Sequence, residues 1–375
     1  MKTKSYYLGL VLLGFLTWSC SNKDEAGLTS ASQGSLKIAM NTGAQNLTTA
    51  MSAITNSKGY QVLESSGPTL GPSLVKSASS STSFVSAPQD TIPLSAIAGI
   101  YDYKAAKYKK WRPELFNFFA KTGTSTDFIV RLPESKVKNP GSLFRFTPTD
   151  TTLVNNYVID VSKYNYNFGR FLWNYDLTST ITIDNTEAGV LNIQSSNNRT
   201  DGYHFMSDFA FANGYDAKIV YSTGDTILSD YNISKAGAII FEEKFTSIKA
   251  DAASRHREKE YSLTIGNVTV VRSPTHANNG LDSAKVYVGG VLQAKATVKF
   301  IDITSKSDTT EFSIVGHNRD LQITFDDGTT QTVSQLLGST ITDVRTLFTS
   351  LRQVYFATSV VDWVAWDIYM NKKNM

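Results

Sequence analysis

The feature that most constrains the fold is a long series of short segments, from Asp127 to Thr332, in which apolar and polar residues alternate. This period of two is typical of β-strands that bury one face. The connections are brief, and parallel neighbours need long crossovers, so the sequence predicts an antiparallel sheet. The expected strands are Phe128–Leu132, Leu143–Thr147, Tyr157–Val161, Tyr164–Tyr175, Ser179–Ile183, Val190–Gln194, Tyr203–Phe211, Ala217–Tyr221, Ala238–Phe245, Tyr261–Ile265, Val268–Arg272, Ala284–Val288, Ala296–Asp302, Glu311–Val315 and Leu321–Phe325.

Three junctions in this series are typical of tight hairpins: Gly266-Asn267, Gly289-Gly290 and Asp326-Asp327-Gly328. Each places glycine or asparagine, which tolerate left-handed backbone, between two apolar segments.

Helical spacing of apolar residues flanks the strands. It covers Asn41 to Ser57, Tyr101 to Lys121, and a long segment that begins at Thr340 or Thr342 and continues toward Met370. The predicted fold is therefore α+β: a large antiparallel sheet body over about residues 127–332, with N-terminal helices and a long C-terminal helix packed on one face.

The chain is expected to divide into four parts. Residues 1–19 form a signal peptide, 20–40 a flexible tether, 41–126 a helical and irregular N-terminal region, and 127–375 the β body closed by the C-terminal helix.

The N-terminus carries Lys2 and Lys4, then the apolar run Leu8–Trp18 and Ser19-Cys20. This order is typical of a secretory signal, and the run is too short to span a bilayer. A cysteine directly after it resembles the lipobox of bacterial lipoproteins. The resemblance implies that Cys20 is acylated, for example with palmitate, and becomes the first residue of the mature chain.

Lys23, Asp24 and Glu25 follow the cysteine. They resemble the export signal of Bacteroidota-type surface lipoproteins. The resemblance implies a protein anchored in the outer membrane and facing the cell exterior, and a periplasm-facing anchor remains the alternative.

Five Asp-Ser/Thr-apolar triplets resemble the O-glycosylation site of the same bacterial group. Asp-Thr and Asp-Ser are also common turn formers, so both interpretations stay open. The acceptor residues would be Thr91, Thr151, Thr226, Ser283 and Thr309.

Composition excludes several function classes. The net charge is +3, and loss of Lys2 and Lys4 with the signal lowers it to +1, too little to indicate nucleic acid as a partner. Cys20 is the one cysteine, so neither an intramolecular disulfide nor a cysteine metal site is possible. The four histidines stand far apart in the sequence. No metal and no cofactor is expected.

Known catalytic motifs are also absent from the sequence: there is no G-x-S-x-G, H-E-x-x-H, Walker loop or G-x-G-x-x-G. Glu242 and Glu243 are neighbours on a predicted strand and so point to opposite faces. Asp326-Asp327 lies in a predicted turn.

The strongest positive signal is the aromatic stretch from Tyr164 to Tyr175. A bulge at Gly169-Arg170 would bring all six rings of the stretch to one face. Such a face is either core or a stacking platform for sugars or another flat ligand, and core is the favoured interpretation. The residues of the alternative platform are Tyr164, Tyr166, Trp173 and Tyr175.

The leading hypothesis is a non-catalytic, surface-exposed envelope lipoprotein that binds an extracellular ligand such as glycan or lipid, or an envelope protein. A structural or adhesive subunit assembled through sheet edges is the alternative. An envelope hydrolase with an unrecognised site is the third hypothesis.

Overall fold

The computed structural model describes eleven stretches of the chain. They are residues 34–64, 90–104, 118–138, 153–168, 173–198, 201–249, 257–272, 284–302, 319–325, 327–352 and 355–373.

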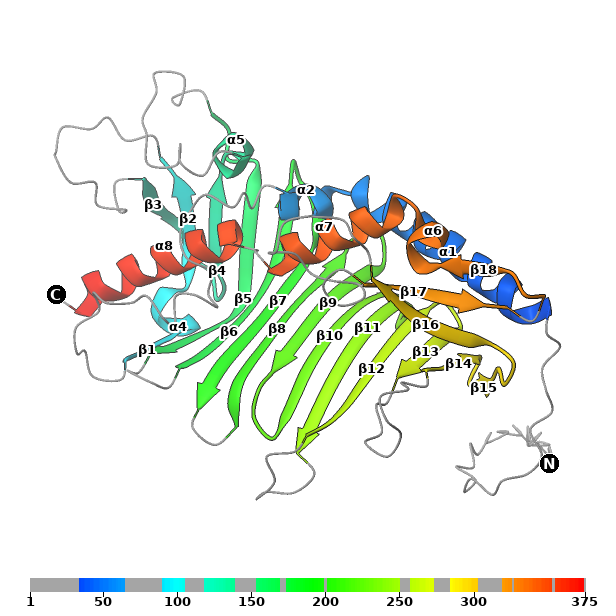
Figure 1. The fold of residues 1–375 in the computed structure, drawn as a ribbon. Coiled ribbons are helices and arrows are strands. Elements are labelled where there is room, and N and C mark those ends of the chain that lie inside the picture. The colour runs from blue at the N-terminus through cyan, green and yellow to red at the C-terminus, as the bar shows by residue number, and fades with distance from the viewer. Residues whose placement is uncertain are drawn as a thin grey trace, which may run out of the picture.

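One large sheet dominates these residues (Figure 1). Its order is β15-β14-β13-β12-β11-β10-β9-β8-β7-β6-β5-β4-β2-β3, and β1 pairs with part of β5. All neighbours are antiparallel except β2 and β4, which are parallel. The strands are β1 Asp90–Pro93, β2 Gly99–Tyr103, β3 Phe119–Gly123, β4 Phe128–Leu132, β5 Tyr157–Phe168, β6 Trp173–Ile183, β7 Thr186–Asn198, β8 Gly202–Phe211, β9 Tyr215–Ser222, β10 Thr226–Lys235, β11 Ala238–Lys249, β12 Arg257–Ile265, β13 Val268–Arg272, β14 Ala284–Val288 and β15 Val291–Leu292.

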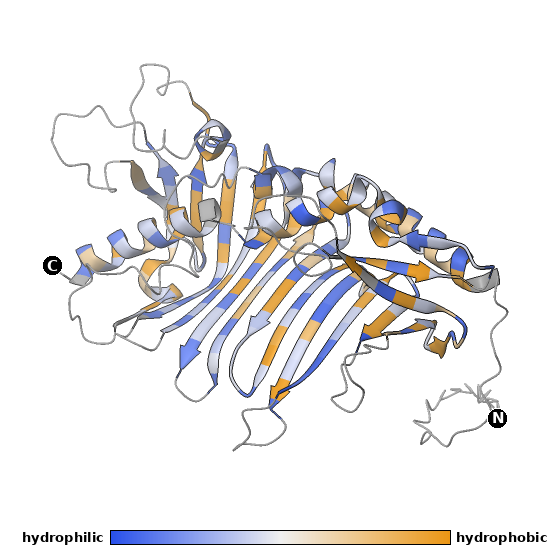
Figure 2. Ribbon diagram, viewed as in Figure 1, coloured by the Kyte–Doolittle hydropathy of each residue, from blue (hydrophilic) through white to orange (hydrophobic). Residues whose placement is uncertain are grey.

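Burial alternates along the strands, as the hydropathy of the sequence predicts (Figure 2). In β6, Tyr175, Leu177, Ser179, Ile181 and Ile183 are buried, whereas the residues between them are partly exposed. The sheet therefore has one face in the core and one face that carries mainly polar side chains.

The longer helices lie across the buried face in one row (Figure 1). They are α1 Gly34–Thr55, α2 Lys58–Glu64, α7 Thr340–Arg352 and α8 Tyr355–Lys373. The short helices are α4 Leu94–Ile97, α5 Glu134–Lys138 and α6 Val333–Leu337. Strands β6 to β12 extend beyond this row, so part of their helix-side face is not covered by a helix (Figure 1). The predicted α+β fold is confirmed.

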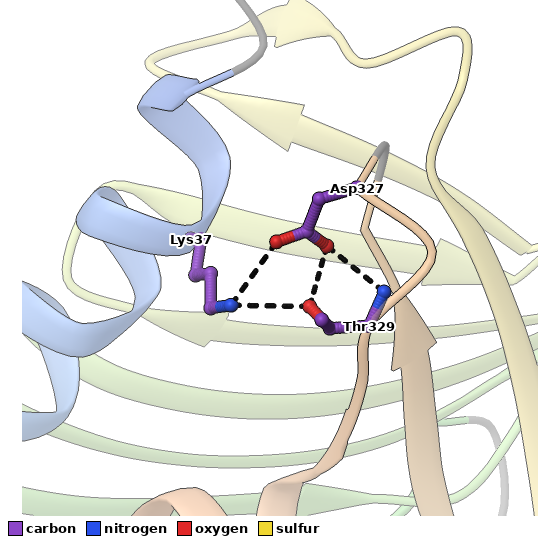
Figure 3. Close-up of polar contacts among 3 residues, drawn as sticks. All are labelled: Lys37, Asp327 and Thr329. Atoms are coloured by element: carbon purple, nitrogen blue, oxygen red, sulfur yellow. Dashed lines mark hydrogen bonds and ion pairs between the residues drawn. The ribbon is translucent and has the colours of Figure 1, made fainter.

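A second sheet of β16 Thr297–Asp302, β17 Arg319–Thr324 and β18 Thr330–Thr332 lies at the α1 end of the molecule (Figure 1). Lys37 of α1 connects this sheet to the helix. The Lys37 Nζ donates hydrogen bonds to Asp327 Oδ2 at 3.2 Å and to Thr329 Oγ1 at 3.1 Å (Figure 3). Hydrogen bonds from Thr329 and Lys37 lower the pKa of Asp327 to about 2. The three predicted hairpins lie where expected, between β12 and β13, β14 and β15, and β17 and β18.

Three expectations about segment boundaries are wrong. The first helix begins at Gly34 rather than Asn41, because Leu36 and Met40 are buried and extend its apolar side into the expected tether. The predicted helix Tyr101–Lys121 contains parts of strands β2 and β3, and the residues between 104 and 118 lie outside the described ones. The boundary at 127 is too late, since β1, β2 and β3 belong to the large sheet.

The C-terminal helical segment is divided into α7 and α8 rather than one long helix. Strand β10 was not expected, and the expected strands Leu143–Thr147 and Glu311–Val315 lie outside the described residues. None of the described helices combines the length and apolar composition of a membrane span.

Candidate functional site

The aromatic stretch forms two strands rather than one bulged strand. β5 ends at Phe168 and β6 begins at Trp173, and the register pairs Phe168 with Trp173 and Tyr166 with Tyr175. A hairpin therefore does what the expected bulge at Gly169-Arg170 would have done: it brings both halves of the stretch to the helix side. Phe171 lies outside the described residues.

The four residues of the alternative platform differ in burial. Tyr164 and Tyr175 are 3% and 2% exposed and belong to the core. Tyr166 and Trp173 are half-buried. Tyr166 packs edge-on against Tyr175, with ring centroids 5.5 Å apart. The platform and core interpretations thus each describe part of this stretch.

The row of rings continues beyond β6 onto β8 and β9, which the aromatic stretch in the sequence does not include. Trp173 contacts Tyr203 of β8 with centroids 6.0 Å apart, and Tyr203 contacts Tyr221 of β9 at 5.9 Å. Both tyrosines are half-buried. We call Tyr166, Tyr175, Trp173, Tyr203 and Tyr221 the aromatic strip.

Three uncharged polar side chains stand beside the strip on the same face: Ser195, Asn197 and Ser229. Trp173 Nε1 donates to Ser195 Oγ at 3.2 Å, which fixes the indole on the sheet. Asn197 stands in register between Trp173 and Tyr203, and Ser229 stands opposite Tyr221. Amide and hydroxyl groups beside aromatic rings are typical of a site for an uncharged, hydroxyl-rich ligand.

Arg352, the last residue of α7, places a positive charge near Tyr203 of the strip. Burial raises the pKa of Tyr203, whereas the nearby Ser195 hydroxyl and the Arg352 guanidinium act to lower it. Arg352 itself is exposed, so it stands at the border between the strip and solvent.

Helix α8 covers the β5–β6 end of the strip with a polar contact. Asp362 Oδ1 accepts hydrogen bonds from Tyr164 Oη at 2.9 Å and Tyr175 Oη at 3.1 Å. Burial of the carboxyl group raises the pKa of Asp362 to about 7, although both hydroxyls act to lower it.

A second buried acid lies under α7. Glu243 is 6% exposed, and its Oε1 accepts a hydrogen bond from Tyr261 Oη at 3.1 Å. Burial raises the pKa of Glu243 to about 8, opposed by Tyr261 and the Arg345 charge. Glu242 lies on the opposite face, as the alternation predicts.

On the opposite face of the sheet, carboxylates stand directly across from lysines of neighbouring strands. Asp208 stands opposite Lys218, and Asp230 opposite Lys244. Burial raises the pKa of both acids, and the lysines oppose it. Within the described residues, no three His, Cys, Asp or Glu side chains form a group that could hold a metal ion.

Several predicted site residues lie elsewhere. Thr91 of β1 and Thr226 of β10 are exposed. The remaining ones fall outside the described residues: Cys20, Lys23, Asp24, Glu25, Thr151, Ser283 and Thr309.

Comparison of the chain with protein-family models, with curated proteins and with solved structures found no match.

Proposed function

We propose that the protein is a non-catalytic lipoprotein, anchored through Cys20 in the outer membrane and exposed at the cell surface, whose aromatic strip binds a neutral extracellular glycan. The observation that carries the proposal is the line of half-buried rings from Trp173 to Tyr221, at the ends of strands β6, β8 and β9.

The chemistry of the strip favours a sugar over the other ligands. Sugar rings present flat C–H faces that pack on aromatic rings, and their hydroxyls need hydrogen-bonding groups such as Asn197 and Ser229 beside them. A lipid would leave these polar groups without partners, which is costly. The uncharged strand neighbours favour a neutral glycan over an acidic one.

The test uses the unacylated Cys20→Ser chain on an array of neutral and acidic oligosaccharides, followed by calorimetric titration of each hit. Tyr203→Ala should weaken binding of a neutral glycan about tenfold, or about 1.4 kcal/mol. Asn192→Ala, on the opposite face, is the matched control and should leave affinity unchanged. Binding that Tyr203→Ala leaves intact, or an array with no neutral hit, contradicts the proposal.

The structural-subunit alternative relies on the end strands of the sheet. β3 has five residues and β15 has two. Short end strands are typical of sheets protected against edge pairing, so this arrangement favours a ligand over a strand-added partner. If the molecular mass in solution increased with protein concentration, and Val291→Pro in the end strand β15 abolished this increase, the structural-subunit alternative would be favoured.

The hydrolase hypothesis would use the carboxylates of the opposite face. Asp208 and Asp230 each stand opposite a lysine, which neutralises them in place. If the wild type hydrolyses a bound glycan and Asp208→Asn does not, this hypothesis would be favoured over simple binding.

Glycosylation of the exposed Thr91 and Thr226 is part of the same proposal, since both follow an aspartate and precede isoleucine. Intact-mass analysis of the secreted protein should show a glycan mass that falls stepwise in Thr91→Ala and Thr226→Ala. Unchanged mass in both would assign the triplets to turn formation.

A further inference from the structure

Helix α8 rests on the sheet through a mixed surface. Its buried side is mainly apolar, but Asp362 on the flank of that side makes two hydrogen bonds to tyrosines of β5 and β6. The residues of the apolar side are Val360, Val361, Val364, Ala365 and Ile368.

The position of α8 decides how much of the strip a ligand can reach. Tyr166 and Trp173 are half-buried. Tyr175 is buried against Asp362 of α8, next to Tyr164 with ring centroids 6.1 Å apart. Tyr166, Tyr175 and Tyr164 thus form a continuous series of rings that runs from the open strip to beneath the helix.

We propose that α8 is a lid that moves off β5 and β6 to expose Tyr175 of the strip together with Tyr164, with the contact of Asp362 to these two hydroxyls as its latch. The inference rests on the proposed function for the identity of the ligand. The movement of the lid needs no ligand.

The carboxyl and hydroxyl groups of the latch can form hydrogen bonds in both the closed and the open state of the lid. In the closed state each tyrosine hydroxyl has a carboxyl acceptor, so neither of these two buried hydroxyls is left without a partner. In the open state water and the hydroxyls of a sugar replace that acceptor. A wholly apolar contact would gain nothing from a hydroxyl-rich ligand, whereas this one exchanges hydrogen bonds with it.

The groups that face Asp362 come from two strands. β5 presents Tyr164 and Tyr166, and β6 presents Tyr175. Asp176 of β6 lies on the opposite face, paired with Lys163. The sequence of α4, Leu-Ser-Ala-Ile, contains no titratable group. β1 contains Asp90, at its far end.

The latch makes the lid sensitive to pH. The pKa of Asp362 is about 7 in the closed state and returns to its ordinary value, 3.8, when the carboxyl group meets water. Between these values the closed lid holds a proton that the open lid releases. Opening should therefore increase about tenfold per pH unit from about pH 4 to about pH 7 and level off above.

Hydrogen exchange detected by mass spectrometry tests this on the unacylated full chain without ligand. After correction for intrinsic exchange rates, peptides from 355–373 should show the tenfold rise per pH unit and the plateau, whereas α1 peptides serve as the internal control. Asp362→Asn keeps the acceptor oxygen but cannot ionise, so its α8 exchange should be independent of pH.

Tyr164→Phe separates the latch from a merely structural contact. Because the Tyr164 hydroxyl lowers the pKa of Asp362, its removal should move the plateau to higher pH. A flat α8 profile in the wild type, or an unchanged profile in Asp362→Asn, overturns the lid. If the exchange result holds and no neutral glycan binds, the proposed function fails and the lid stands. If a glycan binds the strip and the profile is flat, the lid fails alone.

Discussion

Gly43 of α1 lies so close to Ile265 of β12 that a Cβ atom on Gly43 would stand 2.6 Å from the Ile265 carbonyl oxygen. Gly59 of α2 makes a similar approach, with a Cβ at 2.7 Å from the Ala188 carbonyl oxygen. Both N-terminal helices therefore need a glycine to lie against the ends of the strands. At these two positions the helices contact the backbone of the sheet and not only its side chains.

Gly43→Ala should destabilise the protein by about 1–3 kcal/mol, because the new Cβ would clash with the backbone of Ile265, which cannot move without disturbing β12. In an exposed helix the same change would stabilise by about 1 kcal/mol, so the sign is diagnostic. Urea denaturation measures the effect, with Asn46→Ala on the exposed side of α1 as the control. A stabilised Gly43→Ala protein would mean that α1 does not pack as closely as described.

Stability should fall as pH rises through the range set by Glu243. The folded protein keeps this proton up to about pH 8, whereas the unfolded chain releases it near the ordinary value of 4.5. The folded state binds more protons between these values, so the free energy of unfolding decreases with pH there and is level above.

Glu243→Gln should remove that part of the slope and make the protein more stable than the wild type at pH 8. Urea denaturation at several pH values gives the comparison, and Glu187→Gln at an exposed site is the control. Equal slopes for wild type and Glu243→Gln between pH 5 and 8 would contradict a buried neutral acid.

Cys20→Ser should release the protein from membranes, because the chain has one thiol to carry a lipid. The check is fractionation of cells with detergent together with incorporation of labelled palmitate. A mutant that still partitions with lipoproteins would show that residues 1–20 do not act as a lipoprotein signal.

Replacement of Lys23, Asp24 and Glu25 by alanine should leave acylation intact but remove the protein from the surface. Protease treatment of whole cells should then spare the variant and digest the wild type. Equal digestion of the two would assign surface export to another segment.

The strands were predictable wherever one face is apolar, as in β8 and β13. β10 was missed because Ser229, Asp230 and Asn232 interrupt its apolar residues, and pairing with β9 and β11 forms the strand nonetheless. The segment beginning at Tyr101 has helical spacing, but parallel pairing of β2 with β4 makes its start a strand. Long-range pairing of this kind leaves no local signal.

The site was only partly predictable. Asp362 stands between Val361 and Trp363, and an acid within an apolar helical run is a signal of a buried role. Its partners are 198 and 187 residues away in the chain, so only the fold brings them together. Tyr203 and Tyr221 occupy core-facing positions near the ends of β8 and β9, and the sequence pattern alone does not show that they stay half-exposed.

Trp173 separates folding from binding. Truncation of a fully buried tryptophan costs about 3–5 kcal/mol, and an exposed one almost nothing. Trp173 is half-buried and hydrogen-bonded to Ser195, so Trp173→Ala should cost about 1–3 kcal/mol by urea denaturation. Trp173→Phe keeps a ring but loses the Nε1 donor, and should retain most of both stability and glycan affinity. A loss above about 4 kcal/mol in Trp173→Ala would make Trp173 a core residue and remove it from the binding strip. A Trp173→Ala variant with unchanged stability and unchanged glycan affinity would also show that Trp173 does not belong to the binding strip.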